Sequence, residues 1–437
     1  MLNNKATTFA RDRLEQALAL IADPKGEGAR TCLTVYEQAA RAAANASDAR
    51  ARDGITLGPL DGAIVTIKDL FDVAGEVTRA GSKLLAEESK PAEADAPVVR
   101  RLRAAGAVIV AKTNMSEFAF TGLGINPHFG TPGNPADRAR CPGGSSSGAA
   151  VAAADGLCDV AIGSDTGGSC RIPASFCGVV GFKPSAQRIP TDGAFPLSWS
   201  LDSIGSMARS VANCATADAV MAGETPGTLD PVPLAGLRLG IAQGLPLENL
   251  DDTVGKHFPD ALDRLEKAGA RFSNEKMPLI GDMMAALSRA SILVAEVYSI
   301  HRDRLRRRGD DVDQIVRARI EKGCDISSAD YIAVMRTRAA LARAMDARLG
   351  DLDVLVMPST PIVAPRIAEA ATPKDFMARN AMALRNTTIA NFFDLTAISL
   401  PLPRQGDLPT GLMLIARNGH DHRLFRIAAS VERALGA

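Results

Sequence analysis

Residues 60–69 read Leu-Asp-Gly-Ala-Ile-Val-Thr-Ile-Lys-Asp. The run from Ala63 to Ile67 is apolar and rich in β-branched residues, and it is bounded by glycine and by charge. Such a run is typical of a buried strand in a sheet that is covered on both faces. We therefore expect a strand that ends at Lys68 and holds its amine inside the protein.

The same alternation of helical stretches and short apolar strands continues along the chain, which is the α/β pattern. Strands are expected at 31–36, 107–111, 158–163, 353–357, 396–400 and 411–416, and helices at 9–22, 37–52, 95–105, 149–157 and 421–435. We predict an α/β fold, in which one large domain (1–437) has a mixed central β-sheet covered by helices on both faces.

The stretch 225–350 differs from the rest because it is more polar and more helical. Candidate helices lie near 255–268, 280–306 and 328–349. We interpret the stretch as a variable helical insertion in a catalytic core formed by about 55–215 and 350–437.

The composition excludes several classes of function. The 437 residues carry 50 basic and 50 acidic side chains, whereas nucleic-acid and membrane-surface partners favour a basic excess. There is no apolar leader at the N-terminus and no run of 18 apolar residues, so we expect a cytoplasmic protein without a membrane span. The seven cysteines form no CxxC pair, which argues against a disulfide framework and a cysteine zinc site.

Two segments rich in glycine and serine are the candidates for chemistry: CPGGSSSG (141–148) and GSDTGGSCRIP (163–173). Glycine allows positive φ angles and a close approach of the backbone to a ligand. Successive backbone N–H groups can then converge on one anion. A hydroxyl beside such a group of donors is well placed to attack a carbonyl whose oxygen the donors hold.

A serine nucleophile needs a base. None of the five histidines lies in a clear motif. Lys68 is the better candidate, because burial disfavours the charged form of a lysine and lowers its pKa. A neutral lysine can accept a proton directly or through an intervening hydroxyl.

Several motifs together resemble the amidase signature family. The main matches are GAIVTIKDLFDVAG (62–75), AKTNMSEFAF (111–120), PGGSSSGAAVA (142–152), GSDTGGSCRIPASFCGVVGFKPS (163–185) and SLDSIGSMARS (200–210). Weaker matches continue at 357–365, 397–403 and 408–416, so the resemblance covers nearly the whole chain. It implies the amidase signature fold and hydrolysis of a carboxamide C–N bond in a small to medium substrate. The product would be ammonia or an amine, and no metal or cofactor would be required.

The resemblance also implies a catalytic triad. Ser169 would be the nucleophile that forms a seryl acyl-enzyme. Ser145 would be a bridging serine held by a non-proline cis peptide bond, and Lys68 would be the base. The backbone N–H groups that would hold the oxyanion are those of Thr166, Gly167, Gly168 and, as a further donor, Ser169.

The substrate pocket is nominated from nearby residues. The family's KTN…EFA segment nominates Met115 and Ser116, and Gly144 lies beside the bridging serine. Phe195 and Trp199 could form an apolar wall, although a core position for Trp199 is an equal alternative. The expected partner is a small-molecule amide, and analogy with the family suggests a homodimer.

Other functions fit the motifs less well. Residues 144–148 match the G-x-S-x-G elbow of α/β-hydrolases, but no apolar strand precedes them. Cys170 could suggest a cysteine amidase, and no Gly-Lys-Ser/Thr triplet supports a phosphate loop. A non-catalytic binding subunit would be expected to have lost part of the triad. The A subunit of a tRNA-dependent amidotransferase and a urea-like (biuret or allophanate type) amide hydrolase remain as alternatives.

Overall fold

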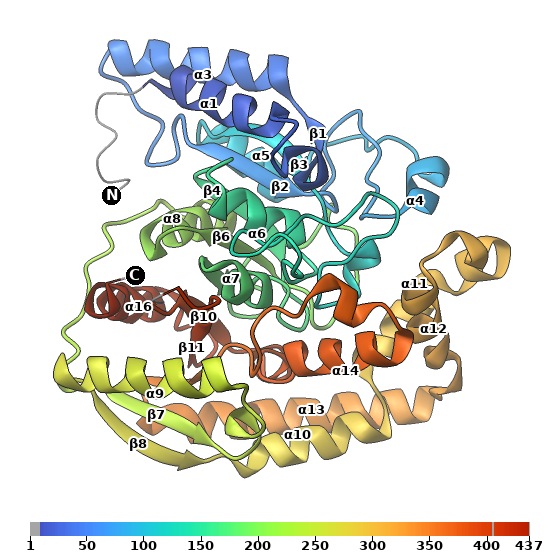
Figure 1. The fold of residues 1–437 in the computed structure, drawn as a ribbon, viewed down its shortest axis with the longest axis vertical. Coiled ribbons are helices and arrows are strands. Elements are labelled where there is room, and N and C mark those ends of the chain that lie inside the picture. The colour runs from blue at the N-terminus through green and yellow to red at the C-terminus, as the bar shows by residue number, and fades with distance from the viewer. Residues whose placement is uncertain (1–8, 404–405, 437) are drawn as a thin grey trace.

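The computed structural model describes residues 9–403 and 406–436 (Figure 1). Within these residues, 11 strands form one sheet in the order β1-β3-β2-β4-β6-β5-β10-β11-β9-β7-β8. Their bounds are β1 Cys32–Val35, β2 Ile64–Lys68, β3 Val108–Thr113, β4 Val160–Ser164, β5 Val180–Lys183, β6 Ile204–Ala208, β7 Arg238–Gln243, β8 Arg271–Lys276, β9 Val354–Pro358, β10 Thr396–Pro401 and β11 Gly411–Ala416.

The sheet is mixed, as predicted. β2 lies between β3 and β4 and runs parallel to both, and β7 pairs in parallel with β8 and β9. The other pairs are antiparallel, including β4 with β6 and β10 with β11. Parallel neighbours require helical crossovers, which explains why helices separate these strands in the sequence.

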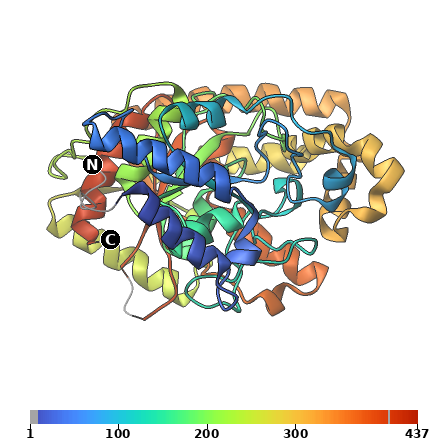
Figure 2. The same cartoon turned by 90° about the horizontal axis from the view of Figure 1, so that it is seen from above.

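Helices cover both faces of the sheet (Figures 1 and 2). The longer ones are α1 Ala10–Ala22, α3 Glu37–Arg52, α5 Pro97–Ala104, α6 Ser147–Ala154, α7 Arg171–Cys177, α8 Val211–Ala222, α9 Asp252–Lys267, α10 Pro278–Arg289, α11 Ile292–Arg308, α12 Gln314–Glu321, α13 Ser328–Arg348, α14 Pro373–Leu384 and α16 Asp421–Leu435.

Side-chain alternation within β3 shows how the two faces are filled. Val108 and Val110 belong to the core that packs against α1, α3 and α6, whereas Ile109 belongs to the core under α5, α8 and α16. Successive side chains of a strand point to opposite faces, so both faces of β3 are apolar. The sequence of a strand that is buried on both faces is a continuous apolar run, and this explains the pattern of 107–111.

The stretch 225–350 is not purely helical, because it also supplies β7 and β8 at one edge of the sheet. By length and composition, one stretch in the described residues, Pro278–Asp311, is apolar enough to cross a membrane, and 33% of its most apolar window is buried. The expected single helix at 280–306 is two helices, because Ala290 has an extended backbone (φ −156°, ψ 131°). α10 packs against α13, and α11 packs against α12.

Candidate active site

The predicted base and its surroundings lie at the carboxyl ends of the central strands β2 and β4. Lys68 ends β2 and Ser164 ends β4, and these strands are parallel neighbours. β6 runs in the opposite direction and pairs Ile204 with Ser164, which brings the preceding Asp202 to the same edge. The carboxyl ends of adjacent parallel strands are a common place for ligand sites in α/β proteins.

The amine of Lys68 is fully buried. Its Nζ donates to Ser145 Oγ at 2.8 Å and to Ser164 Oγ at 2.9 Å. Burial lowers the pKa of Lys68 to about 8, although the carboxylates of Asp165 and Asp202 oppose this shift. The amine is therefore available as a neutral proton acceptor at mildly alkaline pH. Ser164 as a second partner was missed by the sequence reasoning, although it lies in the quoted 163–173 segment.

Ser145 lies just before α6, and the Gly144–Ser145 peptide bond is cis, as predicted. The Ser145 carbonyl accepts a hydrogen bond from the Ser116 N–H at 3.0 Å. A Cβ at Gly144 would lie 2.6 Å from the backbone nitrogen of Gly124 and 2.8 Å from Ser116 Oγ. This close approach explains the glycine before the bridging serine.

Ser169 lies just before α7, and it is 4% exposed. The two serine loops meet here, because the Ser146 N–H donates to the Ser169 carbonyl at 3.3 Å. Within the described chain, no hydrogen bond joins Ser145 Oγ to Ser169 Oγ. Catalytic hydrogen bonds are often long until substrate binds, so the predicted relay through Ser145 stays a prediction.

The loop of Ser169 is organised by a buried ion pair. Arg171 Nη2 and Nε donate to the Asp165 carboxylate at 2.9 and 3.1 Å, and both side chains are fully buried. Burial alone would raise the pKa of Asp165, but the guanidinium holds it at about 2. Asn391 Nδ2 also donates to Asp165 Oδ1, at 2.9 Å. Asp165 and Arg171 therefore order the loop.

The predicted oxyanion donors differ in whether their N–H groups already have a hydrogen-bond partner. The Gly168 N–H donates to Asp165 Oδ1 at 2.9 Å, so it already has a partner. The N–H groups of Thr166, Gly167 and Ser169 make no hydrogen bond to any described residue. Gly168 instead shapes the loop, because its φ is +134° and a Cβ there would lie 2.1 Å from Thr387 Oγ1.

Asp202 is a half-buried carboxylate that the sequence reasoning did not single out, although SLDSIGSMARS was quoted as a motif. Its Oδ1 accepts a hydrogen bond from Thr166 Oγ1 at 2.5 Å. Its Oδ2 accepts from the N–H groups of Leu197 and Ser198 at 2.9 and 3.1 Å. Burial raises the pKa of Asp202 to about 6, against the effect of these hydrogen bonds. Asp202 thus links the Thr166 loop to the segment 195–201.

A cavity of about 240 Å³ opens beside this edge of the sheet. Its lining includes Ser164 and Asp202 at the sheet and Phe195 and Trp199 from the following loop. Trp199 is 64% exposed, which rules out the alternative of a core position.

Three other nominated pocket residues do not line this cavity. Met115 is fully buried within the apolar core. Ser116 is equally buried and contacts Thr121, whose Oγ1 donates to Ser116 Oγ at 2.8 Å. Gly144 precedes Ser145, and a Cβ there would collide with Ser116 Oγ, as described above. The structure therefore brings Ser116 and Gly144 to the backbone of Ser145 and leaves Met115 in the core.

The cysteine alternative is disfavoured by the surroundings of Cys170. Its side chain is fully buried, and a Cβ on Gly205 would lie 2.9 Å from its sulfur. Burial strongly raises the pKa of the Cys170 thiol, so the reactive thiolate is disfavoured. In the described residues, no group of three or more His, Cys, Asp or Glu side chains is arranged to hold a metal ion.

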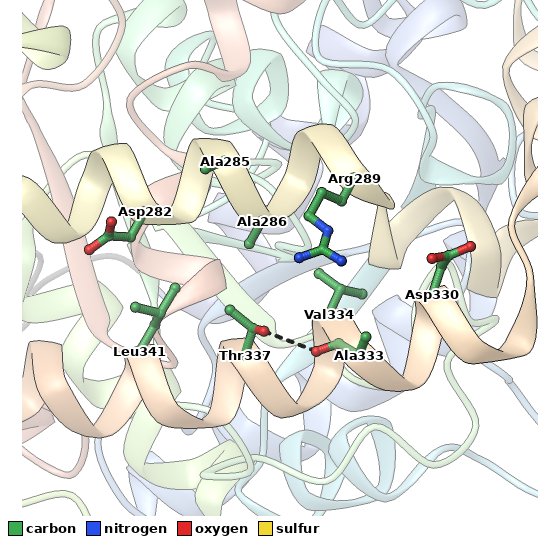
Figure 3. Close-up of a pocket in the computed structure, with 9 residues that line it drawn as sticks. All are labelled: Asp282, Ala285, Ala286, Arg289, Asp330, Ala333, Val334, Thr337 and Leu341. Atoms are coloured by element: carbon green, nitrogen blue, oxygen red, sulfur yellow. Dashed lines mark hydrogen bonds between the residues drawn. The ribbon is translucent and has the colours of Figure 1, made fainter.

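A second cavity, of about 340 Å³, lies between α10 and α13 (Figure 3). Its floor is apolar and includes Ala286 and Val334, and its rim carries Asp282, Arg289 and Asp330. No residue of the predicted triad lines it.

Comparisons with known proteins show the family to which the chain belongs. A family model described as Amidase matches residues 24–425. The chain is 35% identical to 2-amino-5-chloromuconic acid deaminase of Comamonas testosteroni, over 91% of this chain and 87% of that protein. It is 36% identical to 1-carboxybiuret hydrolase subunit AtzE of Pseudomonas sp. (strain ADP), over 94% and 92% of the two chains. A crystal structure of an amidase superposes with a TM-score of 0.87 at 33% identity, over 98% of this chain and 97% of the other.

The chain therefore belongs to the amidase family. It is an enzyme of the hydrolase class that acts on amide C–N bonds.

Proposed function

We propose that Ser169, Ser145 and Lys68 form the catalytic triad of this amidase. The observation that carries the proposal is the hydrogen bond of the buried Lys68 amine to Ser145 Oγ, at 2.8 Å. A lysine with its pKa lowered to about 8 can take a proton from a hydroxyl.

In the proposed reaction, Ser169 Oγ attacks the amide carbon and its proton passes through Ser145 Oγ to Lys68 Nζ. The N–H groups of Thr166, Gly167 and Ser169 hold the oxyanion, because the Gly168 N–H is engaged with Asp165. The C–N bond then breaks, and the leaving nitrogen takes a proton from Ser145 as ammonia or an amine. Water attacks the acyl-enzyme, gives its proton to the same relay and releases the carboxylic acid.

Covalent labelling tests the nucleophile. A fluorophosphonate probe should label the wild type at Ser169, and Ser169→Ala should not react. Labelling that persists in Ser169→Ala would overturn the assignment. Cys170→Ala is the matched neighbour and should retain both labelling and activity.

The pH dependence tests the base. Lys68 is protonated below its pKa, so kcat/KM should fall as the pH drops through about 8. A rate that is constant from pH 5 to 9 would contradict a lysine base.

We propose a small to medium amide as the substrate. The names of two relatives include an acid group, amino-chloromuconic acid in one and carboxybiuret in the other. Amides that also bear a carboxylate are therefore the first class to test, together with aliphatic, aromatic and urea-like amides in an assay for released ammonia. The urea-like hydrolase is tested by the same panel.

The A subunit of a tRNA-dependent amidotransferase is the second candidate, because it shares the motifs of the triad. Hydrolysis of free amides by the purified single chain would count against it. We further propose that the enzyme works in the cytoplasm as a homodimer, without nucleic acid or membrane. The mass in solution, measured by light scattering, tests the dimer.

A further inference from the structure

The cavity of about 340 Å³ between α10 and α13 lies on an exposed face of this helix pair (Figure 3). Two large apolar side chains lie beside its lining, since Met284 is 46% exposed and Ile332 is 56% exposed. Each directly precedes an exposed alanine of the lining, Ala285 in α10 and Ala333 in α13. Exposed apolar side chains next to an apolar hollow indicate a surface that binds another molecule.

The rim of the cavity carries opposite charges at the two ends of α10. Asp282 lies in the first half of the helix and Arg289 is its last residue, and both are exposed. Neither side chain makes an ion pair or a hydrogen bond with any residue of 9–403 or 406–436. Residues seven positions apart lie on the same face of a helix, two turns or about 10 Å from each other. The midpoint between the two charges falls between Ala285 and Ala286.

This spacing makes α10 complementary to a second copy of itself. A two-fold axis between Ala285 and Ala286 brings Arg289 of one copy to Asp282 of the other, and the same ion pair forms again on the other side of the axis. The small side chains at the axis allow the two helices to approach closely. The exposed apolar side chains beside each cavity then pack against the second copy. Such reciprocal contacts define an isologous interface, in which both copies use the same surface.

We propose that the exposed face of α10 and α13 is the contact surface of a homodimer, in which two helix pairs pack around this two-fold axis. The inference rests on the homodimer proposed above and names its interface. The stretch Pro278–Asp311 is also apolar enough for a membrane. A helix that lies on a membrane has a basic polar face, however, whereas this rim presents one base and two acids. The second acid, Asp330, already accepts a hydrogen bond from Ser327 Oγ at 2.6 Å.

Charge reversal tests the reciprocal ion pair. Light scattering should give the wild type twice the mass of one chain. Arg289→Glu and Asp282→Arg should each raise the Kd of the dimer roughly 100-fold or more, because like charges then meet at two places. An equimolar mixture of the two variants should recover the dimer, since every basic side chain again faces an acidic one.

A matched control reverses a charge outside the proposed surface. Arg271→Glu changes an exposed arginine of β8 and should leave the Kd of the dimer unchanged. Three results would each overturn the inference: a monomeric wild type, single variants that dimerise as tightly as the wild type, or a mixture that stays monomeric.

Cross-linking locates the axis without a change of charge. Cys324 is exposed and the other six cysteines are buried, so Cys324→Ser removes the accessible thiol. In that background, Ala285→Cys places one thiol of each copy beside the axis, and a short bismaleimide should join the two chains. Cys324→Ser alone should stay uncross-linked. No cross-link in the double variant would contradict the proposed axis.

Two further measurements separate the interface from the other proposals. A dimeric wild type that releases no ammonia from any amide contradicts the proposed activity and leaves the interface intact. An active monomer contradicts the interface alone. A monomeric wild type that sediments with phosphatidylcholine–phosphatidylglycerol vesicles, and no longer does so as Met284→Ser/Ile332→Ser, would assign the face to a membrane and overturn the inference.

Discussion

The segments around the triad and the stretch 225–350 use charge in different ways. Around the triad, Lys68, Asp165 and Arg171 are fully buried and Asp202 is half-buried, and each makes hydrogen bonds to nearby groups. In the stretch 225–350, by contrast, ion pairs lie along helix surfaces, such as that of Arg317 with Glu321. Exposed pairs contribute little to the free energy of unfolding. Removal of one partner from a buried pair lowers it strongly, because an uncompensated charge is left in the core.

A few side chains of the stretch 225–350 nevertheless contact the segments that carry lining residues of the cavity. Glu296 of α11 accepts hydrogen bonds from Ser198 Oγ and, at 2.7 Å, from Ser200 Oγ, and so holds the loop that carries Trp199. Arg319 of α12 contacts Phe120. We propose that residues 55–215 and 350–437 determine the reaction, while 225–350 is a variable insertion that determines which substrate is accepted.

The largest effect is expected at the base. Lys68→Met should lower kcat by roughly 10⁴-fold, because removal of one member of a catalytic unit costs nearly as much as removal of all. Steady-state ammonia release measures it. Lys183→Met is a matched control, since Lys183 is also buried but donates to the carbonyls of Pro184 and Leu395, and it should act mainly on stability. A comparable loss of kcat in folded Lys183→Met would contradict a specific role of Lys68 as the base.

The next effect concerns the buried pair behind the nucleophile loop. Arg171→Ala leaves Asp165 charged and unpaired in the core and should reduce the free energy of unfolding by about 3–5 kcal/mol. Arg317→Ala, from an exposed pair, should change it by less than about 1 kcal/mol. Denaturant unfolding measures both, and similar values for the two variants would refute the contrast between the regions.

Asp202→Asn should act on both geometry and charge. The asparagine amide faces the N–H donors of Leu197 and Ser198, so Thr166 would shift and kcat should fall roughly 10- to 100-fold. Loss of the carboxylate also disfavours protonated Lys68, so the midpoint of the pH–rate profile should move to lower pH. Asp165 and Cys170 are the other titratable groups that act on Lys68. An unshifted midpoint would restrict Asp202 to a structural role.

Glu296→Gln acts on the loop that carries Trp199, but the substituted residue belongs to the stretch 225–350. It weakens the contacts to Ser198 and Ser200 without altering the charges that act on Lys68, so KM should rise about 3- to 10-fold at an unchanged pH midpoint. Kinetics across the pH range separate this variant from Asp202→Asn. A shift of the midpoint in Glu296→Gln would show that the two regions are not separate in function.

The smallest effect is expected at the pocket wall. Phe195→Ala and Trp199→Ala should change the relative kcat/KM across an amide panel by roughly two- to fivefold, because Trp199 is largely exposed and loses little contact. Unchanged ratios in both variants would remove these residues from the wall.

The sequence predicted those features that depend on local pattern. The apolar run before Lys68 and the apolar run 107–111 indicated buried strands, and the structure confirms both. β5 and β6 were missed because GVVGFK and IGSMA are short and rich in glycine or small residues. β7 and β8 were missed because the surrounding helices dominate the composition of 225–350.

The partners of the site residues could not be read in this way. Asp202 reaches Thr166 only because β6 runs antiparallel to β4, and the direction of a strand is not written in its own residues. The engagement of Gly168 with Asp165 depends on the shape of the loop between them. Contacts of this kind arise from register and packing, which no single segment encodes.

Trp199, at the mouth of the cavity, is the only tryptophan of the chain. All indole fluorescence of the protein therefore originates at one exposed position beside the opening. A ligand that covers this opening would remove water from the ring and move its emission to shorter wavelengths. The enzyme thus carries an optical reporter of occupancy that requires neither a dye nor turnover.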